Sequence, residues 1–129
     1  VVNFAGLSGD YNALHVDAEY AKGTIFGERI AHGLLGLVIG SGLFTRTALN
    51  GKLRKSAVAL LGINHYRFLL PIKFGDTIHV ETEIKEKRET RHPDRGVVIF
   101  CRRVKNQRGE VVQEGEIAMM IRRRRANEW

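Results

Sequence analysis

The longest apolar segment of the chain lies within residues 32–49 and predicts one long helix. Its Leu, Val, Ile and Phe residues point to all sides, which is typical of a buried helix. Its four glycines each cost roughly 1 kcal/mol of helix propensity. They are Gly33, Gly36, Gly40 and Gly42. We expect close approach of a sheet or ligand to compensate for that cost. The segment is too short and interrupted to span a bilayer.

After Asn50 and Gly51 the pattern changes to strands. Four strands are predicted, over residues 57–70, 77–86, 96–105 and 110–122. The last two are joined by a tight turn at residues 106–109. A long buried helix followed by antiparallel strands predicts an α+β fold in which a curved sheet wraps the helix. Shorter helices are expected over residues 1–6 and after Asp17, which can cap one.

The charge balance bears on possible partners. The net charge of +7 comes from 21 Lys and Arg against 14 Asp and Glu, and residues 85–95, 102–108 and 122–125 hold much of the excess. These basic residues are not interleaved with aromatic ones, as a platform for single-stranded nucleic acid requires. We interpret them as a solvated surface and do not expect a nucleic-acid partner.

Two proton-handling groups lie near the start of the chain. Asp10 and His15 occur five positions apart in a segment rich in Gly and Asn, and His32-Gly33 follows where the apolar helix begins. A carboxylate, an imidazole and a backbone N–H at a helix start suit a reaction that moves a proton while negative charge develops on an oxygen. Taken alone, Asp10 is typical of a turn and His15 of a structural histidine.

Residues 8–15, Ser-Gly-Asp-Tyr-Asn-Ala-Leu-His, resemble the Ser-Gly-Asp-x-Asn-Pro-Leu-His signature of the MaoC-like, (R)-specific enoyl-CoA hydratases. The resemblance continues through residues 30–33, 41–43 and 67–76 and implies the hot-dog fold. Ala13 replaces the usual Pro, which should loosen the loop without removing a reacting group. Family members usually carry a strand ahead of this motif. We therefore expect residues 1–129 to form a single MaoC-like domain whose amino-terminal strand is absent or trimmed.

The resemblance implies reversible hydration of a 2-enoyl-CoA thioester to the (R)-3-hydroxyacyl product. Asp10 and His15 would hold one water molecule; one accepts its proton and the other orients it, and the sequence does not decide which is the base. The N–H of Gly33 would bind the enolate oxygen, because orphan amides and the helix dipole favour negative charge there.

Three further residues have supporting roles. Asn12 is expected to fix the loop by hydrogen bonding. His32 either faces the substrate or shapes the turn before the helix. Ser41 lies about 12 Å along the helix from Gly33, at 1.5 Å per residue. By resemblance it lines the site or anchors the catalytic loop, and otherwise it is a small residue that permits close packing.

Coenzyme A would be part of the substrate, so no separate cofactor is expected. A metal site formed by Asp10, His15 and His32 is conceivable, but their spacing does not require one, and we predict none. The lone Cys101 cannot form an internal disulfide, which favours a reducing, cytoplasmic location. One sheet would leave its edge and the helix poorly covered, so we expect a homodimer.

Two other function classes remain. A hot-dog acyl-CoA thioesterase often carries an acidic residue on or near the central helix, whereas residues 33–49 contain no Asp or Glu. A non-catalytic module that binds acyl-CoA or RNA would not need the set of Asp10, His15 and Gly33. Both observations favour the hydratase.

Overall fold

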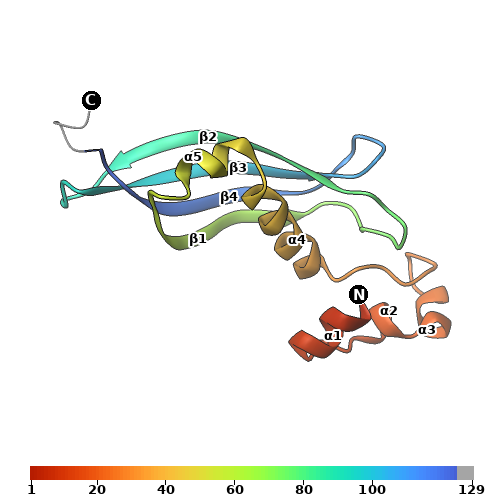
Figure 1. The fold of residues 1–129 in the computed structure, drawn as a ribbon. Coiled ribbons are helices and arrows are strands. Elements are labelled where there is room, and N and C mark those ends of the chain that lie inside the picture. Colours follow the sequence, from red (N-terminus) through yellow and green to blue (C-terminus); the bar gives the residue numbers. More distant parts are fainter. Residues whose placement is uncertain (125–129) are drawn as a thin grey trace.

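The computed structural model describes residues 1–124, which form five helices and one antiparallel sheet (Figure 1). The helices are α1 (Val2–Ser8), α2 (Ala13–Val16), α3 (Ala18–Lys22), α4 (Gly33–Thr45) and α5 (Ala48–Leu53). The strands are β1 (Ala57–Phe68), β2 (His79–Glu89), β3 (Arg95–Lys105) and β4 (Val111–Arg122). Their order in the sheet is β1-β4-β3-β2. The predicted α+β fold is confirmed. Arg125, the last residue of the basic run at 122–125, lies outside the described residues.

The short helices α1, α2 and α3 lie together near the amino-terminal end of α4, beside the sheet and not on it (Figure 1). Helix α1 ends where Gly9 adopts φ 78°, so the helix predicted over residues 1–6 runs two residues further. Asn12 caps α2 by accepting a hydrogen bond from the amide of Leu14, and Asp17 caps α3 as predicted. These caps begin α2 and α3 directly after short turns, so the three helices follow one another closely.

The helix predicted over residues 32–49 is divided in two, because threonine hydroxyls compete with the helical backbone bonds. The Oγ1 of Thr45 donates to the carbonyl of Gly42, and the Oγ1 of Thr47 donates to that of Phe44. The same Thr47 oxygen accepts from the amide of Asn50 and caps α5. Helix α4 therefore ends at Thr45.

Glycines form the face of α4 that lies against the sheet. A Cβ on Gly36 would lie 2.4 Å from Nε2 of Gln113, and one on Gly40 would lie 3.3 Å from Cγ2 of Val104. The expected close approach of the sheet is confirmed. The expectation that α4 is buried on all sides is wrong for the single chain, because the sheet covers only one side of it. Exposed fractions of 57%, 51% and 41% remain for Leu34, Val38 and Ile39.

The two faces of the sheet differ in character. Phe44 of α4 packs with Phe100 and Ile117 to form the core on the inner face. On the outer face, basic side chains pair with carboxylates: Arg103 with Glu83, Lys105 with Glu81 and Lys85 with Glu116. This pairing fits the interpretation of the basic residues as a solvated surface. Among residues 1–124, no helix has the length and apolar character needed to cross a membrane.

Candidate active site

The loop between α1 and α2 carries Asp10 and is held by a series of local hydrogen bonds. The amide of Asp10 donates to Oγ of Ser8 over 3.1 Å, and the amide of Asn12 donates to Oδ1 of Asp10 over 3.2 Å. The amide of Leu14 donates to Oδ1 of Asn12 over 3.1 Å. Asn12 thus fixes the loop through its side chain, and the Asp10 carboxylate remains exposed to solvent.

Two stacked histidines lie behind this loop, with ring centroids 3.9 Å apart. His15 is 9% exposed, and its Nδ1 lies 2.8 Å from the carbonyl oxygen of Ile30. Because a carbonyl only accepts, Nδ1 donates, which leaves Nε2 of the neutral ring as a proton acceptor. His32 is 2% exposed, and its Nε2 donates over 2.8 Å to the backbone carbonyl of Asp10. His32 therefore attaches the loop to the start of α4.

The structure brings Asp10, His15 and His32 together, with ligating atoms that all lie within 4.8 Å of one another. Such a cluster can hold one small molecule between a carboxylate and an imidazole. It is also compact enough for a cation, although one nitrogen of each ring already bonds to a carbonyl. The absence of a metal stays a prediction.

Gly33 is the first residue of α4, so its N–H has no acceptor within the helix. Its carbonyl accepts a hydrogen bond from Nε2 of Gln113 over 2.9 Å, and Oε1 of Gln113 accepts one from the hydroxyl of Tyr66 over 2.7 Å. Burial raises the pKa of Tyr66, which keeps this hydroxyl a donor at neutral pH. Side chains from β4 and β1 thus fix the start of α4.

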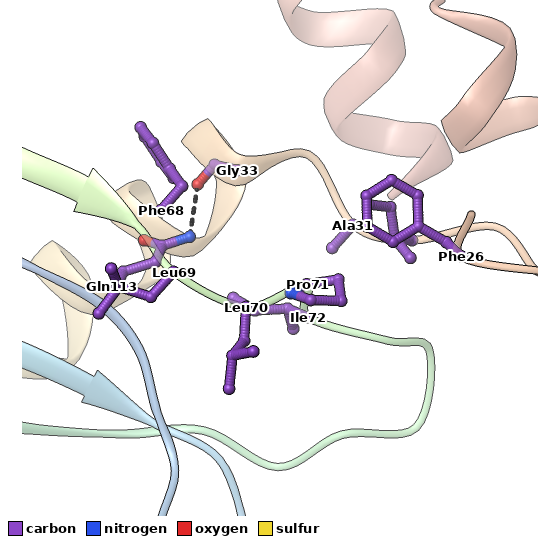
Figure 2. A pocket seen from close by; sticks show the side chains of 10 residues that line it. Phe26, Ala31, Gly33, Phe68, Leu69, Leu70, Pro71, Ile72 and Gln113 are labelled. Carbon is purple, nitrogen blue, oxygen red and sulfur yellow. Dashed lines mark hydrogen bonds between the residues drawn. The ribbon is translucent and has the colours of Figure 1, made fainter. Parts of the chain in front are cut away.

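A cavity of about 290 Å³ lies beside Gly33, between the start of α4 and residues 68–72 (Figure 2). The ring of Phe68 covers Gly33 so closely that a Cβ there would lie 2.8 Å from Cδ1 of that ring. The amide of Ala31 donates to the carbonyl of Ile72 over 2.8 Å, which joins the two walls. Ser41 does not line this cavity; it lines a second one further along α4.

Sequence reasoning does not identify Gln113 and Tyr66. Gln113 is only 1% exposed although it lies in a strand, and a buried amide needs hydrogen-bond partners. Its position directly after Val111 and Val112 is the one signal in the sequence that it is buried. Its hydrogen-bond partners are residues 33 and 66, and no motif or spacing in the sequence indicates that these residues contact it.

Comparisons with known proteins identify the family of this chain. Residues 1–99 match the family model described as MaoC like domain. Protein MaoC of Klebsiella aerogenes is 39% identical over 87 residues, which are 67% of this chain and 24% of that protein. The chain thus spans about a quarter of the length of that relative. An (R)-specific enoyl-CoA hydratase of Rhodospirillum rubrum is 33% identical over 118 residues, 92% of this chain and 74% of that protein.

Solved structures give the same result for the fold. One described as a monoamine oxidase regulatory protein from Archaeoglobus fulgius has a TM-score of 0.87 and 38% identity, and covers 97% of this chain and 81% of that chain. The predicted hot-dog fold is confirmed. The family match over residues 1–99 and the relative from Rhodospirillum rubrum show that this chain belongs to the MaoC-like domain family.

Proposed function

We propose that the chain catalyses the reversible hydration of a 2-enoyl-CoA thioester to an (R)-3-hydroxyacyl-CoA. The observation that carries this proposal is the meeting of the Asp10 carboxylate with the His15 imidazole, their ligating atoms within 4.8 Å, beside the start of α4. The relative from Rhodospirillum rubrum is named for this reaction.

The reaction needs a water molecule held and deprotonated as it attacks. Either the free Nε2 of His15 or the Asp10 carboxylate takes a proton from water while the other group orients it. The oxygen of that water bonds to the β-carbon, and the electrons of the double bond move through the α-carbon onto the thioester oxygen. The α-carbon then accepts a proton, which restores the carbonyl and completes the addition.

The enolate oxygen formed in this step is assigned to the N–H of Gly33. A backbone donor at a helix start is oriented before the reaction begins, and removal of one such donor costs roughly 3–4 kcal/mol of barrier in other enzymes. The contact from Gln113 holds the Gly33 carbonyl and with it the first turn of α4, which carries the Gly33 N–H. When the thioester carbonyl of the substrate and the water molecule are both held in place, only one face of the double bond is open to attack by the water.

Hydration is tested by the loss of the conjugated-enoyl absorbance of crotonyl-CoA. A thioesterase would instead release a thiol, which a disulfide reagent detects, and a binding module would do neither. For the stereochemistry, the product is coupled to an (R)-specific or an (S)-specific 3-hydroxyacyl-CoA dehydrogenase. We expect a signal only with the (R)-specific enzyme, and turnover with the (S)-specific one would exclude the proposed product.

The active form is proposed to be a homodimer. Apolar side chains remain exposed on α4 and on the edge strand β1, where Val58, Leu60 and Phe68 are 53%, 61% and 52% exposed. Such an area fits a surface covered by a second copy. We expect a dimer at micromolar concentration in analytical ultracentrifugation. A fully active monomer would contradict this part of the proposal.

No redox cofactor is included in the proposal, since the reaction adds water without redox change, and no metal is included because Asp10 and His15 supply the acid–base groups. Exhaustive treatment with a chelator should leave the hydration rate unchanged. A loss that zinc or another divalent cation restores would assign a metal to the Asp10, His15 and His32 cluster. The proposed location is the cytoplasm, where the thiol of Cys101 stays reduced.

A further inference from the structure

Arg102 is a buried cation that has no anionic or hydrogen-bonding partner among residues 1–124. It lies on β3 and is 4% exposed, with its Cζ 5.2 Å from the ring centroid of Phe44. Its Nε is buried with no hydrogen-bond partner. Its side chain forms no salt bridge or hydrogen bond within residues 1–124. Because arginine stays charged in proteins, an isolated guanidinium at such depth is costly unless an anion joins it.

In the described part of the chain, the neighbours of Arg102 supply no negative charge. Thr82 pairs with it across β2 and β3, and the Oγ1 of Thr82 is also buried without a partner. On the other side lies Gly115 of β4, and a Cβ there would lie 2.5 Å from Cδ2 of Tyr66, so the tyrosine ring covers this position. Burial lowers the pKa of Arg102, which is the direction expected when no carboxylate compensates the charge.

Arg102 lines a cavity of about 170 Å³ between α4 and strands β1 and β4. Its walls include Leu37, Phe44, Leu60 and Ile117, with Ser41 as a neutral polar group. Gly33, Leu37 and Ser41 recur every four residues, so they follow one side of α4. The cavity thus lies about 12 Å along the helix from the Gly33 amide, at 1.5 Å per residue.

Resting on the function proposed above, we propose that this cavity binds a carboxylate at the far end of the acyl chain. The substrates are then CoA thioesters of dicarboxylic 2-enoic acids. The guanidinium of Arg102 receives the carboxylate through paired hydrogen bonds, and the Ser41 hydroxyl can donate a third. Apolar side chains such as Leu37 contact the methylene groups between the two ends. An acyl chain that ends in a methyl group leaves the Arg102 guanidinium without a counter-charge.

The test uses pairs of trans-2-enoyl-CoA thioesters of equal length that end in a methyl group or a carboxylate. We expect wild-type kcat/KM to favour the carboxylate by at least about tenfold at one or more lengths, because the site is built to hydrogen-bond that group. Arg102→Met should lower kcat/KM for the carboxylate-ended substrates more than for the methyl-ended ones, so that the preference is lost. Arg103→Met is the matched control, since Arg103 pairs with Glu83 on the outer face and its loss should leave the preference intact.

The outcomes separate the two proposals. Hydration of methyl-ended thioesters at least as fast as carboxylate-ended ones at every length would overturn the dicarboxylate inference and leave the hydratase standing. Absence of hydration with both series would overturn the proposed function and this inference with it. The wild type could instead show no preference, and its dimer could dissociate on Arg102→Met. That result would show that Arg102 pairs with a carboxylate of a second copy, and it would also overturn the dicarboxylate inference. If Arg102→Met does not fold, the wild-type comparison decides alone.

Discussion

The two ends of helix α4 differ in how their buried polar groups are satisfied. At the amino-terminal end, Nε2 of His32 bonds to the loop that carries Asp10 and Gln113 bonds to the carbonyl of Gly33, and only Nδ1 of His32 is buried there without a partner among residues 1–124. Further along, Arg102 and Thr82 have buried polar atoms without partners. The first end is organised by the protein itself, as groups that stabilise a transition state must be. For the second, residues 1–124 supply no anion, and the proposed carboxylate of the substrate would complete it.

The largest effect is expected from the reacting groups at the amino-terminal end. Asp10→Asn and His15→Gln should each fold normally and lower kcat by ~10²–10⁴-fold, the usual contribution of a general acid or base. The double variant should lose little more than the worse single one, since both groups act on one water. Steady-state hydration rates and thermal melting check this. Turnover near wild type in either folded variant would show that the reaction is not catalysed at this end of the helix.

The middle of α4 connects the two ends, and at Gly36 it leaves no room for a side chain against the sheet. Gly36→Ala should lower the free energy of unfolding by about 1–3 kcal/mol, because its Cβ would meet Gln113 and Ile72 at 2.4 and 2.7 Å. Gly42→Ala is the control on the same helix, since nothing lies within 4 Å of its Cβ, and it should be neutral or stabilising by up to about 1 kcal/mol. Urea denaturation measures both. Equal losses would contradict the one-sided contact with the sheet.

Gln113 tests whether the amino-terminal end depends on fixed geometry. Gln113→Leu should lower kcat by about tenfold with little change in KM, because the Gly33 amide is needed mainly in the transition state. It should also lower stability by about 1–2 kcal/mol, since the Tyr66 hydroxyl loses its acceptor. Tyr66→Phe removes only that hydroxyl and should have the smaller effect. A change confined to KM would assign Gln113 to substrate binding.

The smallest effect concerns a clamp outside the site. Hydrogen bonds from the Gln107 side chain and the Lys73 amide lower the pKa of Asp76, whose loop holds residues 30 and 31 through Ile72 and Lys73. Because the folded pKa is lowered, this stabilisation is present at neutral pH and is lost as the pH falls through that pKa. Asp76→Asn should cost about 1 kcal/mol at pH 7. Its difference from wild type should shrink on acidification, and a constant difference would argue against the clamp.

The sequence predicts the fold more completely than the site. The glycines of α4 correctly indicate close approach of the sheet, and the caps at Asp17 and Asn12 follow from local chemistry that neighbouring residues determine. Burial of Leu34 and Val38 is predicted wrongly, because an apolar pattern on all sides of a helix does not show that the sheet covers only one of them. Arg102 looks like part of a basic run, yet the two-residue period of a strand places it on the same face as Phe100 and Val104.

The hydrogen bonds of Gln113 with Gly33 and Tyr66 cannot be predicted from the local sequence pattern. They join residues that are 80 and 47 positions apart, and they form only when α4 packs on the sheet. Asp10, His15 and His32 are easier to identify as candidate site residues, because each occurs within a motif of a few residues. Their contact through a stacked pair of rings is still a property of the folded chain.

Strand β1 is exposed and apolar, yet its pairing with β4 is irregular at three places, and His65 within it has φ 52°. Such irregularities bend a strand and interrupt the regular spacing of its outward amides and carbonyls. A foreign extended peptide can then pair with only a few residues before the match fails. The apolar edge therefore accepts a partner of matching shape and resists templating the open-ended stacking from which fibrils grow.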